Sequence, residues 1–148
     1  MEFYTYRLPN GIRGIHRQVK GAVAHCALVV DAGSRDERTG EYGGAHCTED
    51  AFFKGTQRRR AWQVNCRLEN LGGELNAFTT KEDTTIHATT LRSDFPKAAE
   101  LIADVAFRSV YPDRELEREK EVIADEVNTY KDSPANMIHD TLDDMPLA

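Results

Sequence analysis

"GGAHCTEDAFFKGT", residues 43–56, is the stretch that decides how this chain folds. Two glycines precede a run that fits an α-helix, and Gly55 is a natural C-terminal stop for it. In such a helix, His46 and Asp50 lie one turn apart on the same face, with Glu49 beside them. An imidazole and two carboxylates this close together suit a metal ion with a general base, but an ordinary polar helix face gives the same spacing.

The composition is that of one globular domain. A chain of 148 residues is long enough to bury a hydrophobic core, and we expect residues 1–148 to form a single domain. The net charge of −6 argues against a nucleic-acid partner, which would select a clustered basic face. Arg58, Arg59 and Arg60 form a short basic run, which we expect to be a solvated turn at a helix start.

The sequence also indicates the cellular compartment of the protein. No apolar run approaches the roughly 20 residues that a membrane span requires. Residues 1–11 lack the basic and apolar regions of a signal peptide. Cys26, Cys47 and Cys66 are odd in number and have no CxxC spacing, which is typical of a reducing compartment. We therefore expect a cytoplasmic protein that contacts no membrane.

Hydrophobic periodicity and turn residues divide the chain into strands and helices. Strands are expected at residues 2–8, 12–17, 22–33, 74–80 and 83–91. The strand at 22–33 is mostly apolar and is expected to be buried. Helices are expected at residues 44–54, 61–71, 94–110 and 113–131, and another begins at 133. This order predicts an α+β domain, in which helices pack on one face of a largely antiparallel sheet.

Two carboxylates interrupt the apolar stripe of the helix expected at 113–131. Glu119 and Glu126 lie on the stripe that is formed by Leu116, Ile123, Val127 and Tyr130. A core-facing carboxylate is costly unless it is neutralised or has a partner: a basic side chain, a backbone donor or a metal ion. Arg67 and Lys81 are candidate basic partners. Alternatively, the stripe is broad and both carboxylates lie at its solvated edge.

Five segments, taken in order, resemble the pitrilysin-like zinc peptidases, the inverzincin family that includes mitochondrial processing peptidases and insulin-degrading enzyme. They are "LPNGIRGIHR", "VVDAGSRDE", "GGAHCTEDAFFKGT", "RLENLGGELNAFTTKEDT" and "EKEVIADEVNTYKDSP". The resemblance covers nearly the whole chain and implies the first half-domain of such a peptidase. Because these peptidases contain repeated copies of a longer domain, it also implies that residues 1–148 are incomplete: a fragment, a truncated relative or one piece of an assembly.

The resemblance implies a role for particular residues. The family motif is H-x-x-E-H, followed far downstream by a glutamate. His46 matches the first zinc ligand, Glu49 the general base and Glu126 the distal ligand, while Glu119 matches a second acidic residue that supports the site.

Two further matches concern substrate and metal. Asn76 and Ala77 match an edge strand to which the family adds its peptide substrate as a further strand. Asp50 departs from the pattern, because it stands where the motif has its second histidine. Asp50 still offers an oxygen ligand, but one imidazole with two carboxylates is a harder and less zinc-selective set. We therefore expect weakened zinc binding and impaired hydrolysis.

Three interpretations remain open at this point. The first is a zinc metalloendopeptidase domain that cleaves a peptide or unfolded protein, with Glu49 activating a zinc-bound water. The second is a non-catalytic member of the family, which binds peptide or assembles with a partner subunit or second half-domain. The third is a truncated product, in which exposed apolar surface promotes self-association.

Overall fold

The computed structural model describes residues 2–40 and 43–131, apart from the side chains at 126–128, 130 and 131. The helix expected from residue 133 lies outside the described residues.

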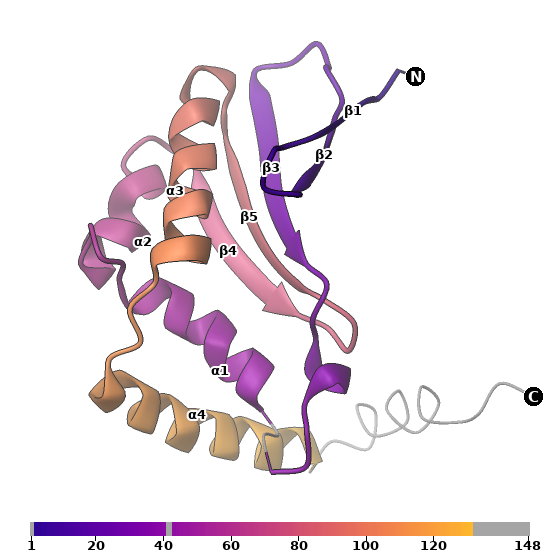
Figure 1. Ribbon diagram of the computed structural model, residues 1–148. Coiled ribbons are helices and arrows are strands. Elements are labelled where there is room, and N and C mark those ends of the chain that lie inside the picture. Colours follow the sequence, from indigo (N-terminus) through magenta and orange to yellow (C-terminus); the bar gives the residue numbers. More distant parts are fainter. Residues whose placement is uncertain (1, 41–42, 132–148) are drawn as a thin grey trace, which may run out of the picture.

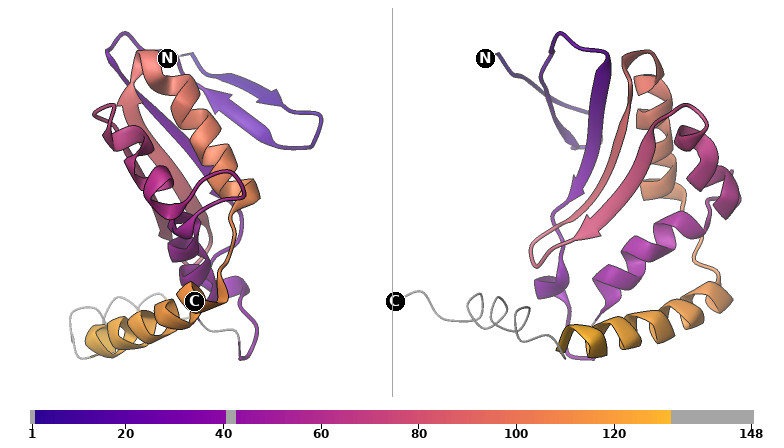
Figure 2. Two further views of the ribbon diagram at one scale, coloured as in Figure 1. Left: turned by 90° about the vertical axis from the view of Figure 1, so that its left-hand side faces the viewer. Right: turned by 180° about the vertical axis from the view of Figure 1, so that it is seen from behind.

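Within the described residues, five strands form two antiparallel sheets. Strands β1 (Tyr4–Arg7) and β2 (Arg13–His16) make the expected hairpin, which stands apart from the rest of the molecule in Figure 2. Strands β3 (Val23–Val30), β4 (Glu74–Thr79) and β5 (Thr84–Leu91) form the second sheet in the order β3-β5-β4. Both β3 and β4 are therefore edge strands within the described residues.

Four α-helices of the described part of the chain accompany the three-stranded sheet. They are α1 (Gly44–Ala51), α2 (Ala61–Glu69), α3 (Phe95–Arg108) and α4 (Asp113–Lys131). Helix α3 packs on β3 and β5, while α1 and α2 pack on β4, and α4 runs past α1 below the sheet (Figure 1). This arrangement confirms the predicted α+β class. Within the described residues, no helix combines the length and the apolar character that crossing a membrane demands.

The hydrophobic core lies between the sheet and helices α2 and α3. Its largest fully buried apolar side chains are Val64, Leu68, Ile86, Leu101 and Val105. The face of β5 with even residue numbers is turned toward the core, as the burial of Ile86 and Ala88 shows. The expected stop at Gly55 is confirmed as well: α1 continues through a short 3₁₀ turn, Phe52–Lys54, and Gly55 then adopts a φ of +122°.

The prediction that residues 22–33 form a buried strand was wrong. Strand β3 is shorter, lies at a sheet edge and alternates between half-buried and exposed residues. Helix α3 covers only one face of it, so Val23 and Val29 on the other face remain 48% and 60% exposed. Phe78 and Leu91 are exposed on the neighbouring strands. This face of the sheet is thus uncovered within the described residues and carries several exposed apolar side chains among polar ones.

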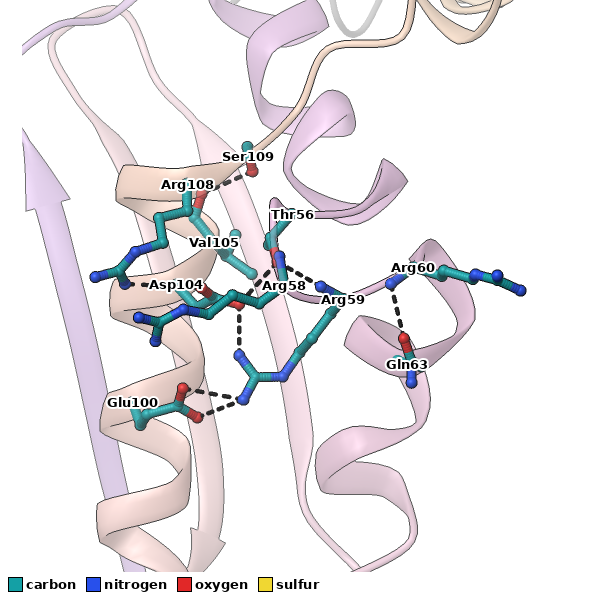
Figure 3. A network of polar contacts seen from close by, with 10 residues as sticks. All are labelled: Thr56, Arg58, Arg59, Arg60, Gln63, Glu100, Asp104, Val105, Arg108 and Ser109. Carbon is teal, nitrogen blue, oxygen red and sulfur yellow. Dashed lines mark hydrogen bonds and ion pairs between the residues drawn. The ribbon is translucent and has the colours of Figure 1, made fainter.

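The basic run is not simply a solvated turn, because Arg59 points inward. Its guanidinium donates hydrogen bonds to Glu100 and to Asp104, whose side chain is only 1% exposed (Figure 3). The hydroxyl of Thr56 donates to Asp104 at 2.8 Å and accepts the backbone N–H of Arg59 at 3.0 Å. This network pins the turn between α1 and α2 onto α3.

We expect Arg59→Ala to lower the free energy of unfolding by about 3 kcal/mol or more, because it leaves the buried Asp104 carboxylate without its main cation. Arg58→Ala is the matched control: its side chain is exposed, so the change should stay within about 0.5 kcal/mol. Urea unfolding of both variants measures the difference. Equal effects would contradict the structural role of the Arg59–Asp104 pair.

Candidate metal centre

The N-terminus of α1 is held by a carboxylate from an earlier loop. Gly43, the residue before the helix, has a φ of +86°, a left-handed conformation that glycine adopts without strain. Glu37 accepts the backbone N–H groups of Gly43 at 2.9 Å and of Ala45 at 2.8 Å. It thereby satisfies two helix donors that lack partners within the helix, and places negative charge at the positive end of α1.

His46 and Asp50 face one another on α1, as the helical spacing predicts. The imidazole Nε2 lies 3.5 Å from Asp50 Oδ2, and the two side chains are 43% and 30% exposed. Two ligand atoms on a tetrahedral zinc ion lie about 3.3 Å apart, since each bond is about 2.0–2.1 Å long. The observed spacing therefore suits two ligands of one zinc ion, and both side chains are open to solvent on one side.

Glu49 is the residue that the motif assigns as general base. Its side chain is partly buried on α1. Within the described part of the chain it makes no hydrogen bond or ion pair. A carboxylate with unused acceptor capacity beside two metal-ligand candidates is able to take a proton from a water molecule.

Glu119 approaches α1 from α4, and its partner is a residue that the sequence analysis did not single out. Lys54, just after α1, places its ammonium 2.8 Å from Glu119 Oε2. The Glu119 side chain is only 13% exposed, which explains why it needs a cation. Among the described residues this cation is neither Arg67 nor Lys81, the two candidates considered above.

Cys47 lies in the same region of α1. Burial raises the pKa of the Cys47 thiol, and the nearby carboxylates of Asp50 and Glu119 raise it further, while Lys120 lowers it. The carboxylates beside the thiol thus disfavour its thiolate form. Asp50 and Glu119 thus both act on Cys47, although they belong to two different helices.

Glu126, the predicted distal ligand, belongs to α4 two turns beyond Glu119. Its side chain lies outside the described residues, so its role as a ligand stays a prediction. No group of three metal-binding side chains occurs among the side chains that are described.

The predicted peptide-binding strand is β4, at the sheet edge next to α1. Asn76 is exposed, whereas Ala77 is only 8% exposed. The side-chain oxygen of Asn76 accepts the backbone N–H of Ala77 at 2.9 Å. One donor of this edge is therefore satisfied by the strand's own side chain.

Comparisons with known proteins confirm the family resemblance. A sequence model described as Insulinase (Peptidase family M16) matches residues 15–145. The chain is 36% identical to the mitochondrial-processing peptidase subunit beta of Saccharomyces cerevisiae, over 88% of this chain and 32% of that protein. It is 35% identical to the uncharacterized zinc protease YmxG of Bacillus subtilis, over 93% of this chain and 34% of that protein.

A solved structure shows the same fold. The crystal structure of a protease from Helicobacter pylori superposes with a TM-score of 0.86 at 27% identity, covering 92% of this chain and 33% of that one. This chain thus spans about a third of the length of the relatives that it matches.

We expect Glu37→Ala to loosen the first turn of α1, because two backbone N–H groups lose their acceptor. A lost helix cap costs about 1–2 kcal/mol, so amide hydrogen exchange at residues 43–51 should become about 5–30 times faster. Asp36→Ala is the matched control, since Asp36 accepts the N–H of Gly33 in the same loop and does not contact α1. If both variants loosen α1 equally, Glu37 is not its cap.

Proposed function

Because this chain belongs to the insulinase family, peptidase family M16, we propose that it forms the metal-binding part of a zinc-dependent peptidase. In this proposal His46, Asp50 and Glu126 hold the zinc ion and Glu49 is the general base. The observation that carries the proposal is the pair of facing donors, His46 and Asp50, fixed on α1 beside Glu49 and close to α4.

Each residue then has a defined task. A bound zinc ion would lower the pKa of a water molecule and polarise a peptide carbonyl. Glu49 takes the proton of the attacking water and returns it to the leaving amine. Glu119 lies beside the metal-binding helix and, paired with Lys54, adds little net charge there. Glu119 is thus a supporting residue in this proposal.

Asp50 makes the site weaker than that of an H-x-x-E-H peptidase. It replaces a neutral ligand by an anionic one, so that three carboxylates, including Glu49 and Glu126, surround one imidazole. Such a set is harder and less zinc-selective. We expect weak zinc binding and slow hydrolysis.

Peptide or unfolded protein is the proposed substrate. A peptide in extended conformation would add to the free edge of β4 through its backbone. To do so at Ala77 it must displace the Asn76 side chain from the Ala77 N–H group. The exposed apolar side chains on the uncovered face of the sheet support a further half-domain, a partner subunit or self-association as its cover.

A second candidate function is peptide binding without hydrolysis, as in a non-catalytic subunit. Asp50 favours it, because this residue alters the metal site and leaves the β4 edge intact. The two functions differ in one observable: a non-catalytic subunit would bind extended peptide equally well with and without zinc.

Zinc titration of the chain and of Asp50→His tests the proposal. The histidine restores the family motif, so the variant should bind one zinc ion at least about tenfold more tightly than the parent chain. Asp31→His adds a histidine at an exposed loop position and should leave zinc affinity unchanged. Glu49→Gln should keep the zinc affinity of its background, since this residue is not a ligand. If Asp50→His and Asp31→His behave alike, position 50 does not face the metal.

A further inference from the structure

Two hollows adjoin at the start of α2 and form what we call the α2 groove. Their volumes are about 440 and 360 Å³, and they share Arg59 and Gln63. The basic residues that line them are Lys54, Arg58, Arg59, Arg60, Arg67 and Lys97. No aspartate or glutamate of the described residues lines either hollow. The groove therefore concentrates positive charge on a chain whose net charge is −6.

Half of this positive charge has no partner among the described residues. Lys54, Arg59 and Lys97 each form an ion pair with a carboxylate. Arg58, Arg60 and Arg67 are exposed and make no ion pair within the described part of the chain. These three guanidinium groups remain available for an anionic ligand.

The backbone that carries two of these arginines is already fixed. Figure 3 shows the guanidinium of Arg59 directed at Glu100 and Asp104, while the side chain of Arg60 extends away from this network. The backbone N–H of Arg60 donates to the side chain of Gln63 at 2.9 Å. Because the turn is pinned in this way, a ligand that binds here does not have to order the backbone first.

The groove also contains an apolar anchor. Trp62 lines the second hollow and is 62% exposed, although it lies on a helix whose neighbouring residue Val64 is fully buried. Arg67 of α2 and Leu71, which lies in the turn just after α2, line the same hollow. Tryptophan and arginine are both enriched among the residues that dominate protein–protein binding.

We propose that the α2 groove binds an acidic peptide segment of a partner protein, which places an apolar side chain against Trp62. The unpaired arginines attract the carboxylates, and Trp62 with Leu71 accepts the apolar residue. An extended polyanion such as RNA fits less well, because it would also meet the surrounding surface of a chain with net charge −6. This function is independent of the zinc site and goes beyond the peptidase proposal.

An intrinsic fluorophore in the groove makes the test possible without a label. Trp62 is the sole tryptophan, so its fluorescence reports on this groove alone. The ligand is a short glutamate-rich peptide with a central leucine, and its control has glutamine in place of every glutamate. Binding of the acidic peptide should shift the emission of Trp62 and weaken as salt is added. The glutamine peptide should bind at least about tenfold more weakly.

Two double variants with equal net charge distinguish the effect of charge in the α2 groove from the effect of the net charge of the chain. Arg60→Glu with Arg67→Glu should weaken binding of the labelled acidic peptide at least about tenfold in fluorescence anisotropy. Arg13→Glu with Arg114→Glu, at exposed arginines of β2 and α4, should change it less than about twofold. Equal losses in the two double variants would overturn the proposal. So would tighter binding of a single-stranded RNA of the same charge, which would assign the groove to nucleic acid.

Discussion

The placement of α1 is the constraint on which the candidate site depends. A helix of eight residues is not stable alone in water, so contacts from other segments must hold it. Glu37 binds its first turn, the Lys54–Glu119 pair joins its far end to α4, and the buried side chains of Ala51 and Phe52 secure it against the core. His46 and Asp50 owe their mutual orientation to this fixed short helix.

The turn after α1 is held on α3 by hydrogen bonds and an ion pair. Thr56 and Arg59 are bound to the buried Asp104 on α3, and the backbone N–H of Gln57 donates to the carbonyl of Arg108. The same network affects the segments on both sides of the turn, α1 and α2. Toward α1 it fixes the segment that carries Lys54, and toward α2 it leaves the flanking arginines exposed around the groove.

Local sequence signals predicted most of the architecture. Strand β4, the threonine-rich strand β5 and the glycine stops follow from short-range preferences, and the edge position of β4 agrees with the family resemblance. The exposed face of β3 did not follow, because an apolar pattern on both faces predicts cover on both, and only one face has it here. Sequence periodicity does not indicate what lies on the second face.

Most of the ion pairs could not be predicted from the sequence, but the burial of one of their carboxylates could. Lys54 and Glu119 are far apart in sequence, so nothing local pairs them. Within the run of three arginines, no pattern distinguishes the inward Arg59 from its neighbours. Asp104, however, falls among Leu101, Ile102 and Val105 at helical spacing, so the argument applied to Glu119 would have predicted that it is buried with a cation.

In the proposed metal centre, α1 and α4 together supply one imidazole and two carboxylates to a single zinc ion. Zinc X-ray absorption on the metal-loaded chain tests this arrangement. We expect nitrogen and oxygen ligands at about 2.0–2.2 Å, with the imidazole signal of His46, and a changed ligand shell in Glu126→Gln. A sulfur ligand at about 2.3 Å, or a spectrum that Glu126→Gln leaves unchanged, would contradict it.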